Sequence, residues 1–94
     1  MKDTQDLSLE PNIDVFMKNL EKMLSEHEGE WTLIGGDLVP LGFYNSEKGA
    51  YKAGLIKYGN VPFLIRQVSQ DYIKHGRNGK PEFIGSLATQ PYHF

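Results

Sequence analysis

The sequence contains no cysteine and no long apolar run. Without cysteine the chain has no disulfide framework, no thiolate nucleophile and no cysteine-ligated metal site, and a reducing, cytoplasmic compartment is the natural expectation. No stretch approaches the ~20 consecutive apolar residues that a membrane-spanning helix needs. The polar start of the chain, residues 1–6, lacks the apolar core of a signal peptide. We therefore predict a cytoplasmic location and no membrane partner.

The residue patterns of common catalytic and metal sites are also missing. The three histidines, His27, His75 and His93, lie far apart, and none shows the spacing of a metal ligand set. No serine sits in a G-x-S-x-G motif, and residues 35–37 are not part of a G-x-x-x-x-G-K phosphate loop. We predict that the chain is not an enzyme and binds neither a cofactor nor a metal. The remaining enzymatic alternative would pair His75 with Asp71.

Positive charge is scarce in the first third of the chain. Residues 1–30 hold three lysines against eight carboxylates, whereas residues 31–94 hold seven lysines and arginines against four carboxylates. An acidic N-terminal third argues against general nucleic-acid binding through that surface. The length of 94 residues, with 39% apolar and 23% charged residues, predicts a single globular domain with one modest core.

The strongest periodic signal lies in residues 12–28. Apolar residues recur there at spacings of three and four, which predicts one amphipathic helix; residues 1–10 before it are expected to be frayed. Such an apolar stripe must be covered, and packing on the chain's own sheet is the commoner outcome. A second chain is the alternative cover. The candidate partner-binding residues are then Phe16, Met17, Leu20 and Met23.

Residues 30–44 predict a pair of strands. Residues 30–34 are rich in the aromatic and β-branched types that favour strands. The Gly-Gly-Asp sequence at 35–37 suits a hairpin turn, and residues 38–44 follow as the second strand. Pro40 cannot donate a ladder hydrogen bond, so we expect this second strand at a sheet edge.

Residues 45–68 predict a helix followed by a third strand. Ser46 is a suitable N-cap for a helix over residues 47–58, and Gly59 is a suitable stop. One face of this helix carries small residues that would let it approach a sheet closely: Ala50, Ala53 and Gly54. The apolar run at residues 63–68 indicates a central strand.

The fold class that these elements predict is α+β: an N-terminal amphipathic helix, then a ββαβ sheet over residues 30–69. Two sheet orders fit. We favour the order 2-1-3, with antiparallel neighbours, because Pro40 argues for the second strand at an edge. The alternative places the third strand beside the second through a right-handed parallel crossover.

Residues 70–94 give a weaker pattern, which predicts either a hairpin or a flexible tail. Residues 72–75 and 82–87 could pair around the turn dipeptide Asn78-Gly79. Residues 75–80 are also the one concentrated basic loop, although a solvated turn is the commoner interpretation. Weak nucleic-acid binding through this loop is our alternative function, with nucleic acid an unlikely partner. Its candidate residues are Arg66, Tyr72, Arg77 and Lys80.

Five short segments resemble a known type of domain. They are G-E-W-T-L-I at 29–34, G-D at 36–37, G-F-Y at 42–44, A-Y-K-A-G at 50–54 and P-F-L-I-R-Q-V at 62–68. They resemble small uncharacterised bacterial and phage domains in which a tryptophan hairpin precedes a helix and a P-F-L-[VI]-R-Q-[VI] strand. The resemblance implies a bacterial or phage source and a ββαβ core. It carries no known activity and transfers no functional residues; Pro40 stands where an apolar residue is expected.

Together these patterns predict a non-enzymatic protein-interaction module, either a small regulator or an accessory subunit. The partner would be another protein or a second copy of the chain, as in a homodimer. Two features lead to this hypothesis: the apolar stripe of the first helix, and sheet edges that can accept a strand or a second subunit.

Overall fold

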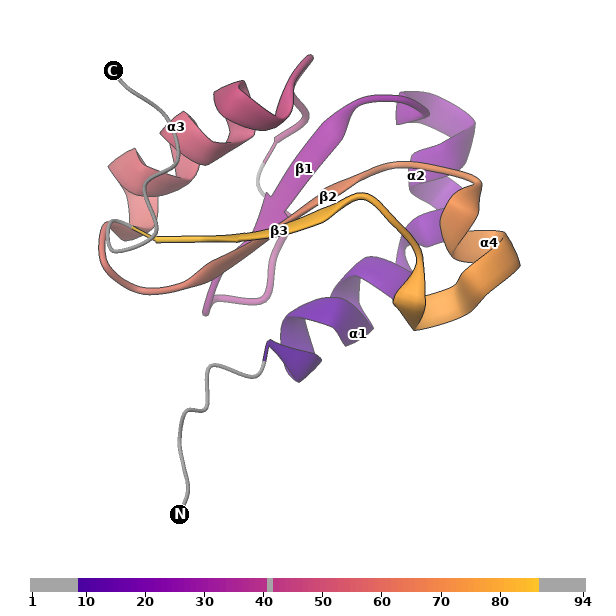
Figure 1. The fold of residues 1–94 in the computed structure, drawn as a ribbon, viewed down its shortest axis with the longest axis horizontal. Helices are drawn as coiled ribbons and strands as arrows, with labels where there is room; N and C mark the ends of the chain where they lie inside the picture. The colour runs from indigo at the N-terminus through magenta and orange to yellow at the C-terminus, as the bar shows by residue number, and fades with distance from the viewer. Residues whose placement is uncertain (1–8, 41, 87–94) are drawn as a thin grey trace.

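The structure is a computed structural model that describes residues 9–40 and 42–86. The predicted α+β class is confirmed, because four helices flank a three-stranded antiparallel sheet (Figure 1). In chain order the elements are α1 (Glu10–Lys18), α2 (Leu20–His27), β1 (Trp31–Ile34), α3 (Glu47–Tyr58), β2 (Phe63–Gln67), α4 (Asp71–His75), the 3-10 turn η1 (Gly76–Asn78) and β3 (Glu82–Gly85). Along this described part of the chain, no helix has the length and apolar character needed to cross a bilayer.

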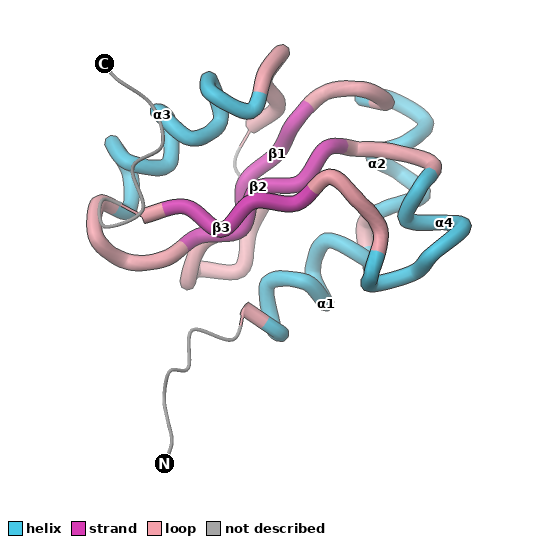
Figure 2. Tube along the Cα trace, in the orientation of Figure 1, coloured by secondary structure: helices cyan, strands magenta, loops and turns pink. Residues whose placement is uncertain are grey.

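The sheet lies between two helical layers. Helix α3 covers one face, and α1 and α2 pack on the other (Figure 2). Strand β2 is central, as predicted, and pairs with β1 in the register Ile34 to Leu64 and with β3 in the register Arg66 to Glu82. Because helices cover both of its faces, β2 reads as an almost continuous apolar run rather than an alternating one.

The favoured order 2-1-3 is wrong as an order of regular strands, because the sheet has the order β1-β2-β3. The antiparallel pairing of residues 30–34 with residues 63–68 that this order required is confirmed, as the pairing of β1 with β2. The described residues of the predicted second strand, 38–44, form no regular strand. Two isolated antiparallel bridges at Pro40 and Tyr44 hold this segment beside β1. Pro40 has no N–H to donate to a ladder, and Leu38 has a positive φ of 59° that turns the chain out of the extended conformation. The third strand of the sheet is instead β3.

The single helix predicted over residues 12–28 is two helices, α1 and α2, separated at Asn19. The side-chain amide of Asn19 donates a hydrogen bond to the carbonyl oxygen of Val15 at 2.8 Å. Asparagine favours such local bonds to the backbone, and they compete with regular helix geometry. Helix α1 also begins at Glu10, two residues before the predicted start, with a proline in its first turn.

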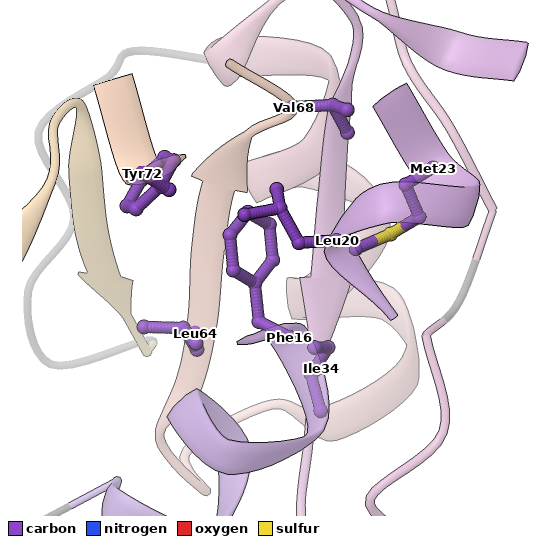
Figure 3. Close-up of a cluster of buried hydrophobic side chains, with 7 residues drawn as sticks. All are labelled: Phe16, Leu20, Met23, Ile34, Leu64, Val68 and Tyr72. Carbon is purple, nitrogen blue, oxygen red and sulfur yellow. The ribbon is translucent and has the colours of Figure 1, made fainter. Parts of the chain in front are cut away.

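The apolar stripe of α1 and α2 is covered by the chain's own sheet. Figure 3 shows Phe16, Leu20 and Met23 from these helices packed among side chains of the sheet and of α4. The cluster consists of Phe16, Leu20, Met23, Ile34, Leu64, Val68 and Tyr72, all of them buried. Full burial of a large apolar side chain contributes roughly 1.5–3 kcal/mol, so this cluster is a main source of stability.

Helix α3 spans the predicted residues, and both of its end signals act as expected. The hydroxyl of Ser46 accepts a hydrogen bond from the backbone N–H of Gly49 at 3.0 Å, and Gly59 ends the helix with a φ of 60°. The small residues face the sheet. A Cβ at Gly54 would lie only 2.2 Å from a ring carbon of Phe63, so the helix approaches β2 as closely as a glycine allows.

The possible hairpin in residues 70–94 is wrong for the described part of that segment. Its first half, the predicted strand at 72–75, lies in helix α4, and β3 pairs with β2 instead. The carboxylate of Asp71 accepts a hydrogen bond from the backbone N–H of Lys80 at 2.7 Å, which joins the start of α4 to the approach to β3. Residues 1–8 and 87–94 lie outside the described residues, and with them most of the predicted frayed start and the predicted tail.

Candidate functional site

The residues predicted for nucleic-acid binding come together, but around a buried arginine. The side chain of Arg66 is 1% exposed, and its guanidinium carbon lies 4.6 Å from the centre of the Tyr72 ring. Its Nε donates to a carboxylate oxygen of Glu82 at 3.0 Å, and one Nη donates to the backbone carbonyl of Arg77 at 2.8 Å. This arginine therefore joins β2, β3 and η1 in the interior, because a buried charge needs such partners.

The other cations of this cluster lie on its surface. The guanidinium of Arg77 contacts the carboxylates of Asp14 and Glu10 on α1, and the hydrogen bond with Asp14 is the main reason that the pKa of Arg77 is raised. Lys80 is exposed. Three cationic residues thus stand beside four carboxylates in this cluster, namely those of Glu10, Asp14, Asp71 and Glu82. Such a balance offers a phosphate backbone little net attraction.

The predicted partner-binding residues lie mainly in the core. Phe16 and Leu20 are buried under the sheet, and Met17 is half-buried with its sulfur 3.9 Å from Arg66. Met23 is buried too, but it also contributes to the floor of a depression that opens at the surface. Of the four, Met23 is the residue that lines this depression, whereas Met17 is the more exposed but lies outside it.

This depression, which we call the α2 groove, has a volume of about 250 Å³. Its lining residues are Asn19, Lys22, Met23, Glu26, His27, Pro40 and Phe43. Helix α2 forms one wall, and the bridged segment beside β1 forms the other. The groove combines apolar and aromatic side chains with charged groups on α2, which is the composition typical of binding sites.

His27 from α2 and Phe43 from the bridged segment form one stacked pair, which we call the aromatic wall of the α2 groove, and this wall is held in a defined position. The rings of His27 and Phe43 stack with centroids 3.6 Å apart and planes inclined by 4°. The Nδ1 atom of His27 lies 3.0 Å from a carboxylate oxygen of Glu30, and its Nε2 atom lies 4.0 Å from Glu26. A wall fixed in this way loses little conformational freedom on binding, so more of the contact energy appears as affinity.

Exposed apolar side chains adjoin the groove along the chain. Leu38 and Val39 directly precede Pro40 and are 40% and 57% exposed. Among residues 9–40 and 42–86, the exposed large apolar residues are Leu38, Val39, Ile56, Val61, Ile73 and Ile84. The segment that leads into Pro40 therefore exposes apolar side chains, although neither of them lines the groove itself.

Two histidines have carboxylate neighbours. The pair of His75 and Asp71, which was named from the sequence, is brought together, with Nε2 of His75 3.6 Å from Asp71. The contact of His27 with Glu30 was not singled out. The Glu30 partner is three residues from His27, a helical spacing that could have been noticed. The stack with Phe43 could not, because the two residues are separated by a whole strand.

The pair of His75 and Asp71 has the geometry of an i, i+4 contact on the surface of a helix. Both side chains are exposed, at 52% and 36%, in an open depression that Asn78 and Lys80 also line. Within the described residues, no group of three or more histidine and acidic side chains could hold a metal ion.

Comparisons with known proteins add no relatives to this description. No protein-family model matches the chain, and neither the curated proteins nor the solved structures provide a match. The resemblance to small bacterial and phage domains therefore stays a prediction.

Proposed function

We propose that this protein is a non-enzymatic interaction module, a small regulator or accessory subunit, that binds a segment of another protein chain in the α2 groove. The observation that carries the proposal is the groove itself. Its wall of His27 and Phe43 is already fixed, and Met23 and Pro40 supply further apolar surface. A cytoplasmic location suits such a module in a chain that lacks cysteine.

The size of the groove fits an anchor rather than a whole interface. A volume of about 250 Å³ accommodates one or two side chains of a partner, and a few anchoring side chains carry most of the energy at protein interfaces. The exposed Leu38 and Val39 would extend the contact beside the anchor. The partner is another protein or a second copy of the chain.

The test is capture of partners from the native cell by tagged chains, with bound proteins quantified. Two variants damage the groove: Phe43→Ala removes half of the aromatic wall, and Glu26→Arg places a long cationic side chain at its edge. Ile73→Asp is the control, because Ile73 is an exposed apolar residue on α4, outside the groove lining. Circular dichroism establishes that each variant is folded.

We expect a protein that the native chain and Ile73→Asp capture equally well and that both groove variants lose. Capture that all four chains share, or that Ile73→Asp alone removes, would contradict the proposal. The captured protein can then be purified and its affinity for the same four chains measured, which separates direct binding from binding through a third component.

Weak nucleic-acid binding through the basic loop is the second proposal. Arg77 and Lys80 lie on one exposed stretch. However, Arg66 is buried and Arg77 already contacts two carboxylates, so binding of a protein segment in the α2 groove is favoured over nucleic-acid binding. This alternative predicts binding to single-stranded nucleic acid that weakens steeply with salt and falls in the double variant Arg77→Ala, Lys80→Ala. Binding that is insensitive to salt or to these changes would exclude it.

A further inference from the structure

The two helical layers of this molecule differ in charge. Residues 10–30, which contain α1 and α2, hold two lysines and six carboxylates, and α4 and η1, which pack on the same side, add Lys74 and Arg77 against Asp71. Residues 45–61, which contain α3, hold three lysines and one carboxylate. These layers lie on opposite faces of the sheet (Figure 1). The charge of the molecule is therefore unevenly distributed, with an acidic helical layer on one face of the sheet and a basic helical layer on the other.

The basic layer also presents the most exposed large apolar side chain among the described residues. Ile56 on α3 is 81% exposed. Lys57 follows it directly, and Lys52 lies one helical turn earlier; both are exposed. An apolar side chain beside cations suits the α2 groove, whose floor at Met23 is apolar. The groove lining carries one carboxylate, Glu26, and one lysine, Lys22, so the complementary negative charge comes from the acidic α1 and α2 layer as a whole.

We propose that the occupant of the α2 groove is a second copy of this chain, which inserts Ile56 and places Lys57 near Glu26. This inference rests on the proposed function, because it names the partner of the same groove. One chain cannot fill its own groove with Ile56, since α2 and α3 lie on opposite faces of its sheet. The contact is therefore between different surfaces of two copies, and it repeats from head to tail.

The association is expected to be weak and sensitive to salt. One anchoring side chain and a small number of exposed charge pairs form an interface at the low end of specific contacts. Exposed charges are largely screened beyond about 10 Å at 0.1 M salt, so the association constant falls as salt rises. Because each added copy offers a new groove and a new Ile56, the average mass keeps rising with protein concentration instead of stopping at a dimer.

Sedimentation velocity of the purified full chain at low salt tests this inference. We expect Ile56→Asp and Glu26→Lys each to lower the association constant at least about tenfold. Two controls make the same chemical changes elsewhere: Ile73→Asp on α4 and Glu21→Lys on the exposed part of α2. Both controls are expected to associate like the native chain.

Mixing the two damaged variants gives the decisive result. The Ile56→Asp chain keeps an intact groove, and the Glu26→Lys chain keeps an intact α3. Each is monomeric alone, but together they form one-to-one pairs that do not grow, because the outer surfaces of each pair are both damaged. A mixture that stays monomeric would overturn the proposal, as would a native chain that is monomeric at all concentrations.

These outcomes are separable from those for the proposed function. A native chain that stays monomeric, yet captures a different protein that Phe43→Ala and Glu26→Arg lose, overturns the second-copy inference and leaves the interaction module standing. Association that the groove variants do not weaken, together with capture that they do not change, overturns both.

Discussion

Arg66 is the residue at which the described part of the structure concentrates its buried charge. Its partner Glu82 lies directly across from it in the β2–β3 register and is only partly exposed. Glu82→Gln keeps the shape of the side chain but removes the charge that compensates the guanidinium. We expect this change to lower the free energy of unfolding by about 1–3 kcal/mol, measured by urea denaturation.

The matched comparison for this prediction is Asp14→Asn. Asp14 also contacts an arginine, Arg77, but that pair is exposed, and exposed ion pairs contribute little to stability. The urea midpoint of Asp14→Asn is therefore expected to stay close to that of the native chain. Equal losses for the two variants would show that burial of Arg66 is not what makes its pair important.

The buried side chain of Tyr72 should make the free energy of unfolding depend on pH in the alkaline range. Burial raises the pKa of Tyr72 well above its ordinary value, and its hydroxyl donates a hydrogen bond to the carbonyl oxygen of Pro81. In the unfolded chain a tyrosine loses its proton near pH 10. Above that pH the unfolded state binds fewer protons than the folded state, so the free energy of unfolding falls as the pH rises.

Tyr72→Phe separates the two contributions of this side chain. At pH 7 the variant loses the hydroxyl's hydrogen bond, which costs about 1 kcal/mol. From about pH 10 upwards its stability is expected to fall less steeply than that of the native chain, because one ionising group has been removed. Urea midpoints of the native chain and of Tyr72→Phe, measured from pH 8 to pH 12, show how steeply the stability of each falls with pH. Equally steep falls would contradict the raised pKa of Tyr72.

At the scale of the elements, the contact between α3 and the sheet depends on a glycine. Gly54→Ala should raise helix propensity by about 1 kcal/mol, but its Cβ would overlap the ring of Phe63. Overpacking a core costs about 1–3 kcal/mol, so we expect a net loss of stability. Thermal unfolding followed by circular dichroism measures the change.

Gly49→Ala on the same helix is the control for this prediction. Its Cβ would first meet the hydroxyl of Ser46 at 3.3 Å, a small side chain at the exposed end of α3. We expect Gly49→Ala to be at least as stable as the native chain. If Gly54→Ala were equally stable, α3 would not approach β2 as closely as the structure describes.

The elements that the sequence predicted well are those whose signals are local. Helix α3 has its cap at Ser46 and its stop at Gly59 next to it, so both ends could be read directly. Helix α4 was missed because it has only five residues and because its partners are distant. Asp71 accepts a hydrogen bond from the backbone N–H of Lys80, nine residues later. Glu82 of β3 accepts a hydrogen bond from Arg66 of β2, which lies 16 residues earlier.

The same distinction explains what could be predicted of the candidate site. Met23 was singled out from the helical stripe, and the spacing of His27 and Glu30 was readable from the sequence. The stack of His27 on Phe43 required the knowledge that Pro40 and Tyr44 form bridges to β1. A groove formed by segments that are distant in the sequence produces no periodic pattern of residues, so the sequence alone does not predict it.

At the scale of the whole molecule, one thin sheet joins two buried clusters. Leu20 belongs to the cluster on the α1 and α2 side, whereas Trp31 packs against the cluster on the α3 side. Both clusters use β2, through Leu64 on one face and Ile65 on the other. The two helical layers should therefore unfold together rather than one after the other.

Leu20→Ala tests this coupling. Loss of a buried leucine costs about 2–5 kcal/mol, and the variant leaves every contact of Trp31 in place. Trp31 is the only tryptophan of the chain, so its fluorescence reports the α3 side, while far-ultraviolet circular dichroism reports all helices. We expect the urea midpoints from the two probes to fall by the same amount, because the α3 layer cannot keep its sheet once the opposite layer is lost.

Ile73→Ala is the control, since a change at this exposed position of α4, outside both clusters, should leave both midpoints nearly unchanged. If the fluorescence midpoint of Leu20→Ala stayed at the native value while the dichroism midpoint fell, the α3 layer would be stable without α1 and α2. The stability of the sheet would then depend little on α1 and α2, the helices that cover its other face. Because β2 contributes alternate side chains to both clusters, the structure argues for a single transition in which both faces of the sheet are lost at once.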